Sequence, residues 1–215
     1  QDFRMSGSLQ LVPLLRRYGT FLGFLLIVSF FWTQRPDTFM TTRNWLNITQ
    51  QVSILCVISF TMTLVMVGGD FDLSVGSMAS LSGMIAAVLW QQDVSLFGAL
   101  GTAVLVGAFG GVFNGVLVAY AGLSAFVATL GTLTIFSGLA LLVSNGKTIF
   151  GRAIPEIVGD FSRGGIPLAE GIQLPNLTLI AILVLILMGI ILQHTVFGRN
   201  LHAVGGNREA SMLAG

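Results

Sequence analysis

A long stretch without charge constrains this chain more than any other feature. Residues 94 to 146 contain no Asp, Glu, Lys, Arg or His. The whole chain is 54% hydrophobic and 9% charged, whereas ordinary soluble domains carry about 25% charged residues. A soluble fold could hardly cover its surface with such a sequence. The apolar runs are continuous rather than alternating, so helices are favoured over a transmembrane barrel.

Six apolar runs follow one another along the chain, and each predicts one membrane-spanning helix. We therefore predict an all-α, polytopic transmembrane helical bundle with about six spans. Residues 1–17 precede the first run, residues 18–193 form the transmembrane region with a polar loop at 145–176, and residues 194–215 form a polar tail. The predicted spans cover approximately residues 18–32, 48–67, 75–90, 96–120, 125–143 and 177–193.

Two carboxylates, Asp70 and Asp72, interrupt the apolar sequence between the second and third runs. A charge at membrane depth is costly and marks a polar or wet site. In the structural interpretation, Gly68 and Gly69 let the backbone unwind and Asp72 caps the third helix through the N–H of Ser74 or Val75. In the functional interpretation, the segment is a polar element of a translocation pathway, and both can hold together.

Small and polar residues mark the fourth and fifth runs. Gly107, Gly111 and Gly115 recur every four residues, with Asn114 beside them. Such a stripe usually lets two helices pack closely, and the alternative is a face along a narrow pathway. Threonines of the fifth run usually bond their own helix carbonyls, with the pathway again the alternative. The pathway or helix-break candidates are therefore Gly68, Gly69, Asp70, Asp72, Ser74, Asn114, Thr129 and Thr132.

The polar tail has the pattern of a short helix that follows a break. Gly205 and Gly206 are expected to end the preceding structure, Asn207 is a favourable N-cap, and Glu209 falls in the first turn. An apolar face follows at residues 210 to 214. Such a helix can enter a groove on a partner or lie on lipid headgroups, and the residues alone do not decide between them. The chain has no G-x4-G-K-[ST] sequence, so ATP chemistry is expected on another chain.

Four collinear segments carry a resemblance to a known family. They are GGDFDLSVGSMASLSG, GVFNGVLVAY, FVATLGTLTIFSGLALLVSNGKTI and HTVFGRNLHAVGGNREASMLAG. Together they resemble the membrane permease subunits of bacterial monosaccharide ABC importers, of the ribose, arabinose, xylose and galactoside type. The resemblance runs from about residue 39 to 215. Family members are longer, so the chain resembles their N-terminal portion, and the C-terminal remainder of the family fold is expected to be absent from it.

The resemblance implies a transport subunit rather than an enzyme. It implies import of a monosaccharide, a pentose or related sugar, across the bacterial inner membrane, with the N-terminus and the tail cytoplasmic. The implied partners are ABC ATPase subunits, a periplasmic sugar-binding protein at the 145–176 loop, a second permease chain and the lipid bilayer. Nucleic acid is not expected, and neither is a metal or cofactor on this chain, because ATP and Mg would bind the ATPase. The residues implied in ATPase coupling are Gly205, Gly206, Asn207, Glu209, Ala210, Leu213 and Gly215.

Two rival functions stay open at this point. A proton-coupled secondary transporter would use Asp70 or Asp72 as the proton carrier. A membrane scaffold without transport would need neither carboxylate for function. A catalytic pair is not expected, because no His, Lys or metal-ligand cluster accompanies the two carboxylates in the sequence.

Overall fold

The computed structural model describes residues 8–214, and for residues 8–14 and 152 it describes the backbone alone. The described chain is mainly helical, with one small β-hairpin. In chain order its elements are α1 (Ser8–Gln34), α2 (Pro36–Phe39), α3 (Thr42–Val67), α4 (Val75–Gln91), α5 (Leu96–Ala119), α6 (Ala125–Val143), the short 3₁₀ helix η1 (Gly151–Ala153), α7 (Glu156–Arg163), β1 (Gly165–Ala169), β2 (Ile172–Pro175), α8 (Asn176–His194), α9 (Val196–Gly206) and α10 (Arg208–Ala214).

The predicted helical membrane fold is confirmed. Within the described residues, five helices are long and apolar enough to cross a bilayer, namely α1, α3, α5, α6 and α8. The remaining predicted span, at residues 75–90, corresponds to α4, which is apolar but has only 17 residues. At 1.5 Å per residue it is about 25 Å long, somewhat less than the ~30 Å hydrocarbon core. Residues 68–74, which precede α4, are not helical and could span the rest of this thickness.

The chain divides into two compact units, residues 1–49 and 50–215. In the first unit, aromatic rings fix the turn around the short helix α2. The Phe31 and Phe39 rings stack with centroids 5.7 Å apart, and Phe39 meets Trp45 edge-on at 5.8 Å. The Asn44 side-chain amide donates to the Phe39 carbonyl oxygen at 2.9 Å. These contacts reverse the chain between α1 and α3.

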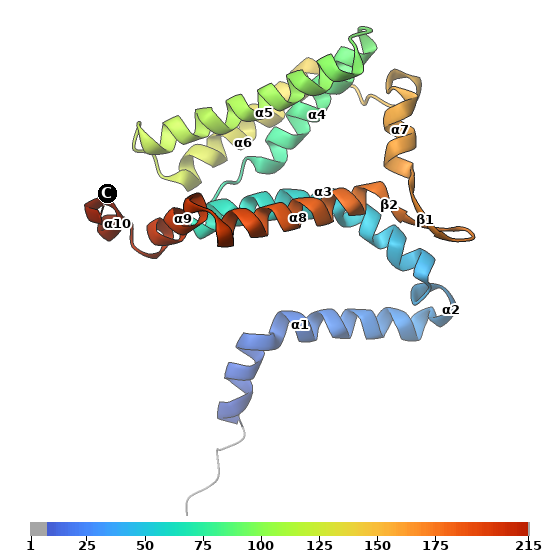
Figure 1. Ribbon diagram of the computed structural model, residues 1–215, viewed down its shortest axis with the longest axis horizontal. Helices are drawn as coiled ribbons and strands as arrows, with labels where there is room; N and C mark the ends of the chain where they lie inside the picture. The colour runs from blue at the N-terminus through green and yellow to red at the C-terminus, as the bar shows by residue number, and fades with distance from the viewer. Residues whose placement is uncertain (1–7, 215) are drawn as a thin grey trace, which may run out of the picture. The chain divides into compact units, whose positions relative to one another are not determined.

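In the second unit, α4, α5 and α6 lie side by side and enclose a small core (Figure 1). Its buried members are Leu81, Phe136 and Ala140. The close approach of α4 to α5 occurs at Gly110, where an added Cβ would collide with the side chain of Met78. The packing face of α5 therefore runs through positions 107, 110 and 114.

The predicted stripe of glycines is partly wrong. Gly107 lies against α4, where an added Cβ would be 3.4 Å from the Ser82 Oγ. Gly111 and Gly115 have no described atom within 4 Å of a Cβ built on them. The reason is helical geometry, because positions 107, 110 and 114 share one face, whereas a strict four-residue repeat drifts away from it.

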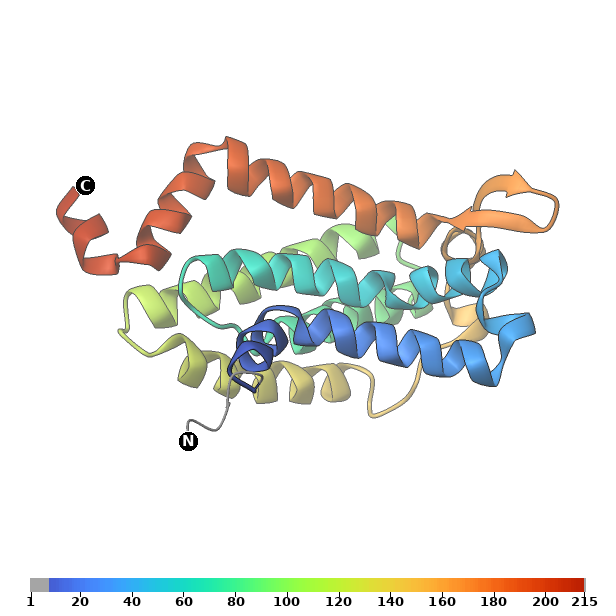
Figure 2. The ribbon, with the colours of Figure 1, turned by 90° about the horizontal axis from the view of Figure 1, so that it is seen from below.

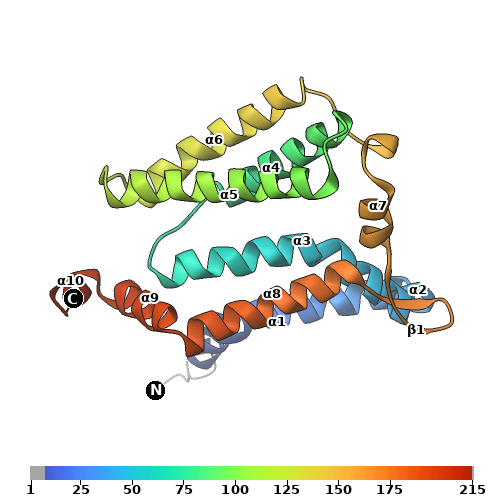
Figure 3. The same ribbon diagram turned by 45° about the horizontal axis from the view of Figure 1, so that its top comes forward.

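Helices α3 and α8 form a second pair in this unit (Figure 3). The Ser53 and Thr178 hydroxyls lie 3.4 Å apart between them, and both residues are buried. After α8 the chain bends sharply into α9, and α10 follows (Figure 2). Thr195 caps α9 by accepting the Gly198 N–H at 3.1 Å. A side chain at Gly198 would collide with the last carbonyls of α8, so the bend requires a glycine there.

The polar segment at 145–176, predicted as a loop, contains regular structure. Helix α7 begins after Pro155 and ends before Gly164, and β1 pairs antiparallel with β2. The hairpin turns at Gly171, whose φ of +69° favours glycine. The Gln50 side-chain amide joins α3 to α7 by donating to the Ser162 carbonyl oxygen at 2.8 Å. This segment lies at the end of the unit opposite α9 and α10 (Figure 1).

Candidate functional site

The segment that joins α3 to α4, residues 68–74, is called here the connector. It starts with a helix-ending turn of the Schellman type. The Asp70 N–H donates to the Val65 carbonyl oxygen at 3.2 Å, and the Gly69 N–H donates to the Met66 carbonyl oxygen at 3.0 Å. Gly69 has a φ of +88°, which only glycine adopts without strain. The predicted helix break at the two glycines is therefore confirmed.

Asp72 organises the other end of the connector. Its Oδ1 accepts the Ser74 backbone N–H and the Ser74 hydroxyl, both at 2.7 Å. The predicted bond from Asp72 to the Ser74 N–H is confirmed. The prediction that Asp72 itself caps the helix is corrected, because α4 starts at Val75 and its N-cap residue is Ser74. Asp72 holds a local turn one step earlier, as Asp side chains often do by bonding the backbone two residues on.

A chain of hydrogen bonds continues from Asp72 into the helix bundle. The Asn114 Nδ2 of α5 donates to the Ser74 Oγ at 2.7 Å, and that hydroxyl donates in turn to Asp72. Asn114 is 6% exposed and Ser74 only 1%. The Asn114 Oδ1 is buried and has no hydrogen-bond partner among the described residues. The apolar bundle of α4, α5 and α6 thus contains a chain of hydrogen bonds that runs from Asn114 through Ser74 to Asp72. The Asn114 Oδ1 could accept one more hydrogen bond.

Helix α6 holds the connector from its other side. The Thr129 Oγ1 accepts the Leu73 N–H at 3.1 Å and donates to the Ala125 carbonyl oxygen of its own helix at 2.7 Å. Thr132 is buried as well, and its hydroxyl donates to the Thr129 carbonyl oxygen at 3.3 Å. Five of the predicted candidates, Asp72, Ser74, Asn114, Thr129 and Thr132, therefore lie around the start of α4.

The glycines of the connector touch the last turns of α9. A Cβ added to Gly68 would come within 3.0 Å of the Leu201 side chain. A Cβ added to Gly69 would lie 3.4 Å from the Gly205 Cα, and one added to Gly205 would collide with the Val67 carbonyl oxygen. Backbone meets backbone here, so the approach is closer than side chains would allow.

A charged contact extends this interface. The Arg208 Nη1 lies 3.8 Å from the Asp70 Oδ2. The arginine side chain is 56% exposed and the aspartate side chain 35%. We call residues 201–208 the α9–α10 corner. Asp70 thus faces the corner at the edge of the bundle, whereas Asp72 is bound inside it.

The predicted tail helix is present as α10. The Asn207 Oδ1 accepts the Ala210 N–H at 2.9 Å, which confirms Asn207 as its N-cap. Gly206 is the last residue of α9, so the predicted break falls one residue later, at Asn207. Glu209 lies in the first turn, and Leu213 is 91% exposed. Gly215, the last predicted coupling residue, lies outside the described residues.

A groove lies between α9 and α10. Its volume is about 760 Å³. Val204 and Met212 are among its lining residues, and Met212 is 74% exposed. The apolar side chains of Met212 and Leu213 on α10 are thus largely exposed in the described chain. Exposed apolar side chains beside a groove are typical of a surface that meets a partner.

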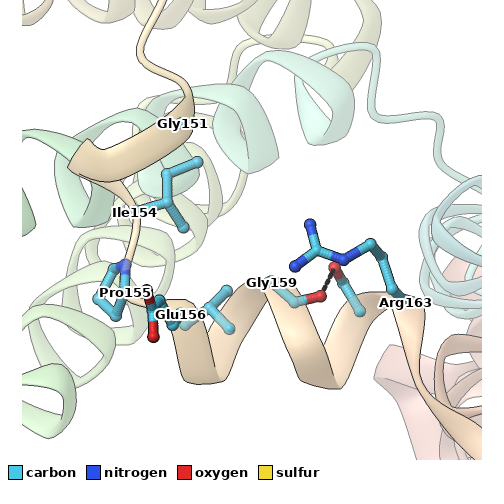
Figure 4. A pocket seen from close by; sticks show the side chains of 8 residues that line it. Gly151, Ile154, Pro155, Glu156, Gly159 and Arg163 are labelled. Carbon is cyan, nitrogen blue, oxygen red and sulfur yellow. Dashed lines mark hydrogen bonds between the residues drawn. The ribbon is translucent and has the colours of Figure 1, made fainter.

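The opposite end of the unit carries a second surface pocket, of about 760 Å³ (Figure 4). It is formed by η1 and α7, with Ile154, Pro155 and Glu156 in its wall. Two charged side chains of this segment pair with each other, because Arg163 lies 3.2 Å from Asp160. The side chain of Arg152 lies outside the described residues. Among the described residues, no cluster of His, Cys, Asp or Glu could hold a metal ion.

Residues 44–215 match a family described as branched-chain amino acid transport system / permease component. The chain belongs to this permease family. It is a multi-pass membrane protein of a family of transport subunits, as the sequence predicted. The matched range includes the connector, helices α4, α5 and α6, and the α9–α10 corner.

The permease is similar to several curated sugar permeases. It is 34% identical to the D-allose transport system permease protein of Escherichia coli over 93% of its own length and 59% of that protein. It is 33% identical to the ribose import permease protein of Bacillus subtilis, over 94% and 61% of the two chains. It is 34% identical to the L-arabinose ABC transporter permease protein of Azospirillum brasilense, over 94% and 57%. The chain spans about three fifths of the length of these relatives. No solved structure matches it.

Sequence reasoning missed two members of this site in the permease. Arg208 was not among the predicted residues, although it is the charged partner of Asp70. The Leu73 N–H was also missed, because a backbone donor leaves no sequence signal. The position of Arg208 directly after the predicted N-cap was the one available hint. Asp70 was the less explained carboxylate, and its partner lies 138 positions away in sequence.

Asp72→Ala should destabilise the permease, because the Ser74 N–H and hydroxyl lose their shared acceptor. Losing a cap of this type costs about 1 kcal/mol. Asp72→Asn should retain most of the stability, since the amide oxygen still accepts. Asp70→Ala should change stability little, because exposed ion pairs contribute between about 0 and 1 kcal/mol. Thermal unfolding in detergent measures all three, and equal losses for Asp70→Ala and Asp72→Ala would contradict this division.

Proposed function

We propose that the chain is the transmembrane subunit of an ATP-driven importer that carries a monosaccharide across the bacterial inner membrane. The family match over residues 44–215, together with relatives named for allose, ribose and arabinose, carries this proposal. The three relatives are almost equally similar, so the substrate class is a monosaccharide and the individual sugar is left to experiment.

In this proposal, ATPase subunits bind the α9–α10 corner and α10. The exposed apolar side chains of Met212 and Leu213 supply the contact, and the groove between α9 and α10 receives side chains of the partner. Glu209, which is exposed, lies at the rim of the same surface. ATP and Mg belong to the ATPase subunits. This assignment places α10 and the N-terminus in the cytoplasm, since six spans return the chain to the same side.

The opposite end of the unit then faces the periplasm. The pocket formed by η1 and α7 offers a surface to a sugar-binding protein that delivers the substrate. Glu156 is exposed there and is available for an ion pair with that partner. A second permease chain completes the pathway between two membrane subunits. The two states of the importer differ by rigid-body rocking of helices, driven by closure of the ATPase subunits.

Leu213→Glu should weaken ATPase binding about tenfold or more, because a buried apolar anchor at an interface contributes about 2 kcal/mol. Leu213→Met should retain binding, since the side chain stays apolar and of similar volume. Co-purification of the ATPase and ATP-dependent uptake of D-ribose, D-allose and L-arabinose into proteoliposomes measure the effect. Uptake that vanadate leaves unchanged and an uncoupler abolishes would instead indicate a proton-coupled transporter. A protein that binds no ATPase and transports no sugar would indicate a scaffold.

A further inference from the structure

Successive residues of the connector contact successive turns of the α9–α10 corner. Gly68 meets Leu201, Gly69 meets Gly205, and Asp70 meets Arg208. Positions 201 and 205 are four residues apart on one face of α9, and Arg208 follows the helix break at Asn207. Three consecutive connector residues thus each contact the corner, so the interface does not depend on one isolated approach. A surface cavity of about 400 Å³ lies beside it.

The far end of the same connector is bound inside the helix bundle. Leu73 donates to Thr129 of α6, and Asp72 is joined through Ser74 to Asn114 of α5. Only two residues, Phe71 and Asp72, separate Asp70 from Leu73. An extended residue spans at most about 3.6 Å, so little slack exists between the two anchored ends.

We propose that Asp70 and Arg208 are positioning residues for transport, which tie the α9–α10 corner to the start of α4. A displacement of the corner then pulls the connector, and the connector moves the N-terminus of α4 against α5 and α6. The proposal rests on the proposed function, in which the ATPase displaces this corner. It gives Asp70 a role outside the substrate pathway, with Arg208 as its partner.

The physical character of the ion pair suits a contact that forms in one state and opens in another. The two groups are partly exposed and 3.8 Å apart, so their attraction is modest and sensitive to salt. A conformational equilibrium responds only to contacts that differ between its states. A weak pair at the moving corner can bias that equilibrium without locking it, whereas a buried pair would be costly to separate.

The test compares sugar transported per ATP hydrolysed in proteoliposomes that contain the permease and its ATPase. Asp70→Asn and Arg208→Gln should each lower this ratio about threefold, the range of an exposed ion pair. The charge exchange Asp70→Arg with Arg208→Asp should restore most of the ratio. High salt should lower the ratio of the unmodified protein and leave the single variants unchanged. Asp93→Asn, a loop carboxylate at the other end of α4, is the matched control.

A second measurement needs no transport. In Arg208→Gln, amide hydrogen exchange at residues 73–77 should become faster, because the connector transmits the loss of the contact with Asp70, whereas Asp93→Asn should leave it unchanged. Unchanged exchange in Arg208→Gln, or a charge exchange that recovers nothing, would overturn the link. If the unmodified protein takes up no sugar with ATP while exchange still responds to Arg208→Gln, the proposed function fails and the link stands.

Discussion

Gly205→Val should strongly disrupt the α9–α10 corner. A Cβ at this position collides with the Val67 carbonyl oxygen and lies 3.2 Å from the Gly68 carbonyl carbon. Both are backbone atoms, so neither can move away as a flexible side chain would. Overpacking of this kind costs about 1–3 kcal/mol. We expect a fall in Tm of about 4–8 °C, which corresponds to roughly 2 kcal/mol in a chain of this size.

The neighbouring glycine provides the control. Gly206→Val places the same side chain one residue further on in the last turn of α9, where a Cβ meets no described atom within 4 Å. The two variants share the same change in helix propensity, so their difference isolates the collision. Thermal unfolding in detergent and hydrogen exchange at residues 66–70 compare them. Equal Tm values for the two variants would show that Gly205 does not contact the end of α3.

Much of the fold could be predicted because the membrane simplifies the problem. A lipid-facing backbone must satisfy its own hydrogen bonds, so each long apolar run becomes a helix. The predicted run at 125–143 coincides with α6, and the run at 75–90 differs from α4 by one residue. The first run was too short, because α1 continues through the polar residues before it. Hydropathy has no signal for helix that extends beyond the bilayer.

The site was predictable where its bonds are local in sequence and was missed where they are not. The bond from Asp72 to Ser74 and the cap from Asn207 to Ala210 each span two or three residues, so residue type and spacing suffice. The contact between Asp70 and Arg208 depends on how α9 folds back on α3, which no local pattern encodes. Gly110 was overlooked for a related reason, because the direction of the packing face depends on where α4 lies.

Ser74→Ala should be the most damaging small change inside the bundle. The lost hydroxyl is the middle of the chain from Asn114 to Asp72, and its removal leaves the Asn114 Nδ2 buried without this partner. Since the Asn114 Oδ1 already lacks a partner among the described residues, the whole amide would be unsatisfied. A buried unpaired group costs about 1–3 kcal/mol. The control is Ser77→Ala, whose hydroxyl bonds only the Ser74 carbonyl oxygen of the preceding turn, so little should change.

The double variant distinguishes the polar chain from simple packing. Asn114→Leu introduced into Ser74→Ala removes the orphaned amide and keeps a similar volume, so the pair should be more stable than Ser74→Ala alone. If Ser74 and Asn114 contributed to packing independently, the losses of stability of the two single variants would add in the double variant. Unfolding midpoints of the four proteins in this cycle supply the coupling, and a double variant less stable than either single would show that Ser74 and Asn114 do not act as a pair. Recovery would mean that the buried polar chain fixes the start of α4, which is the element that the connector moves.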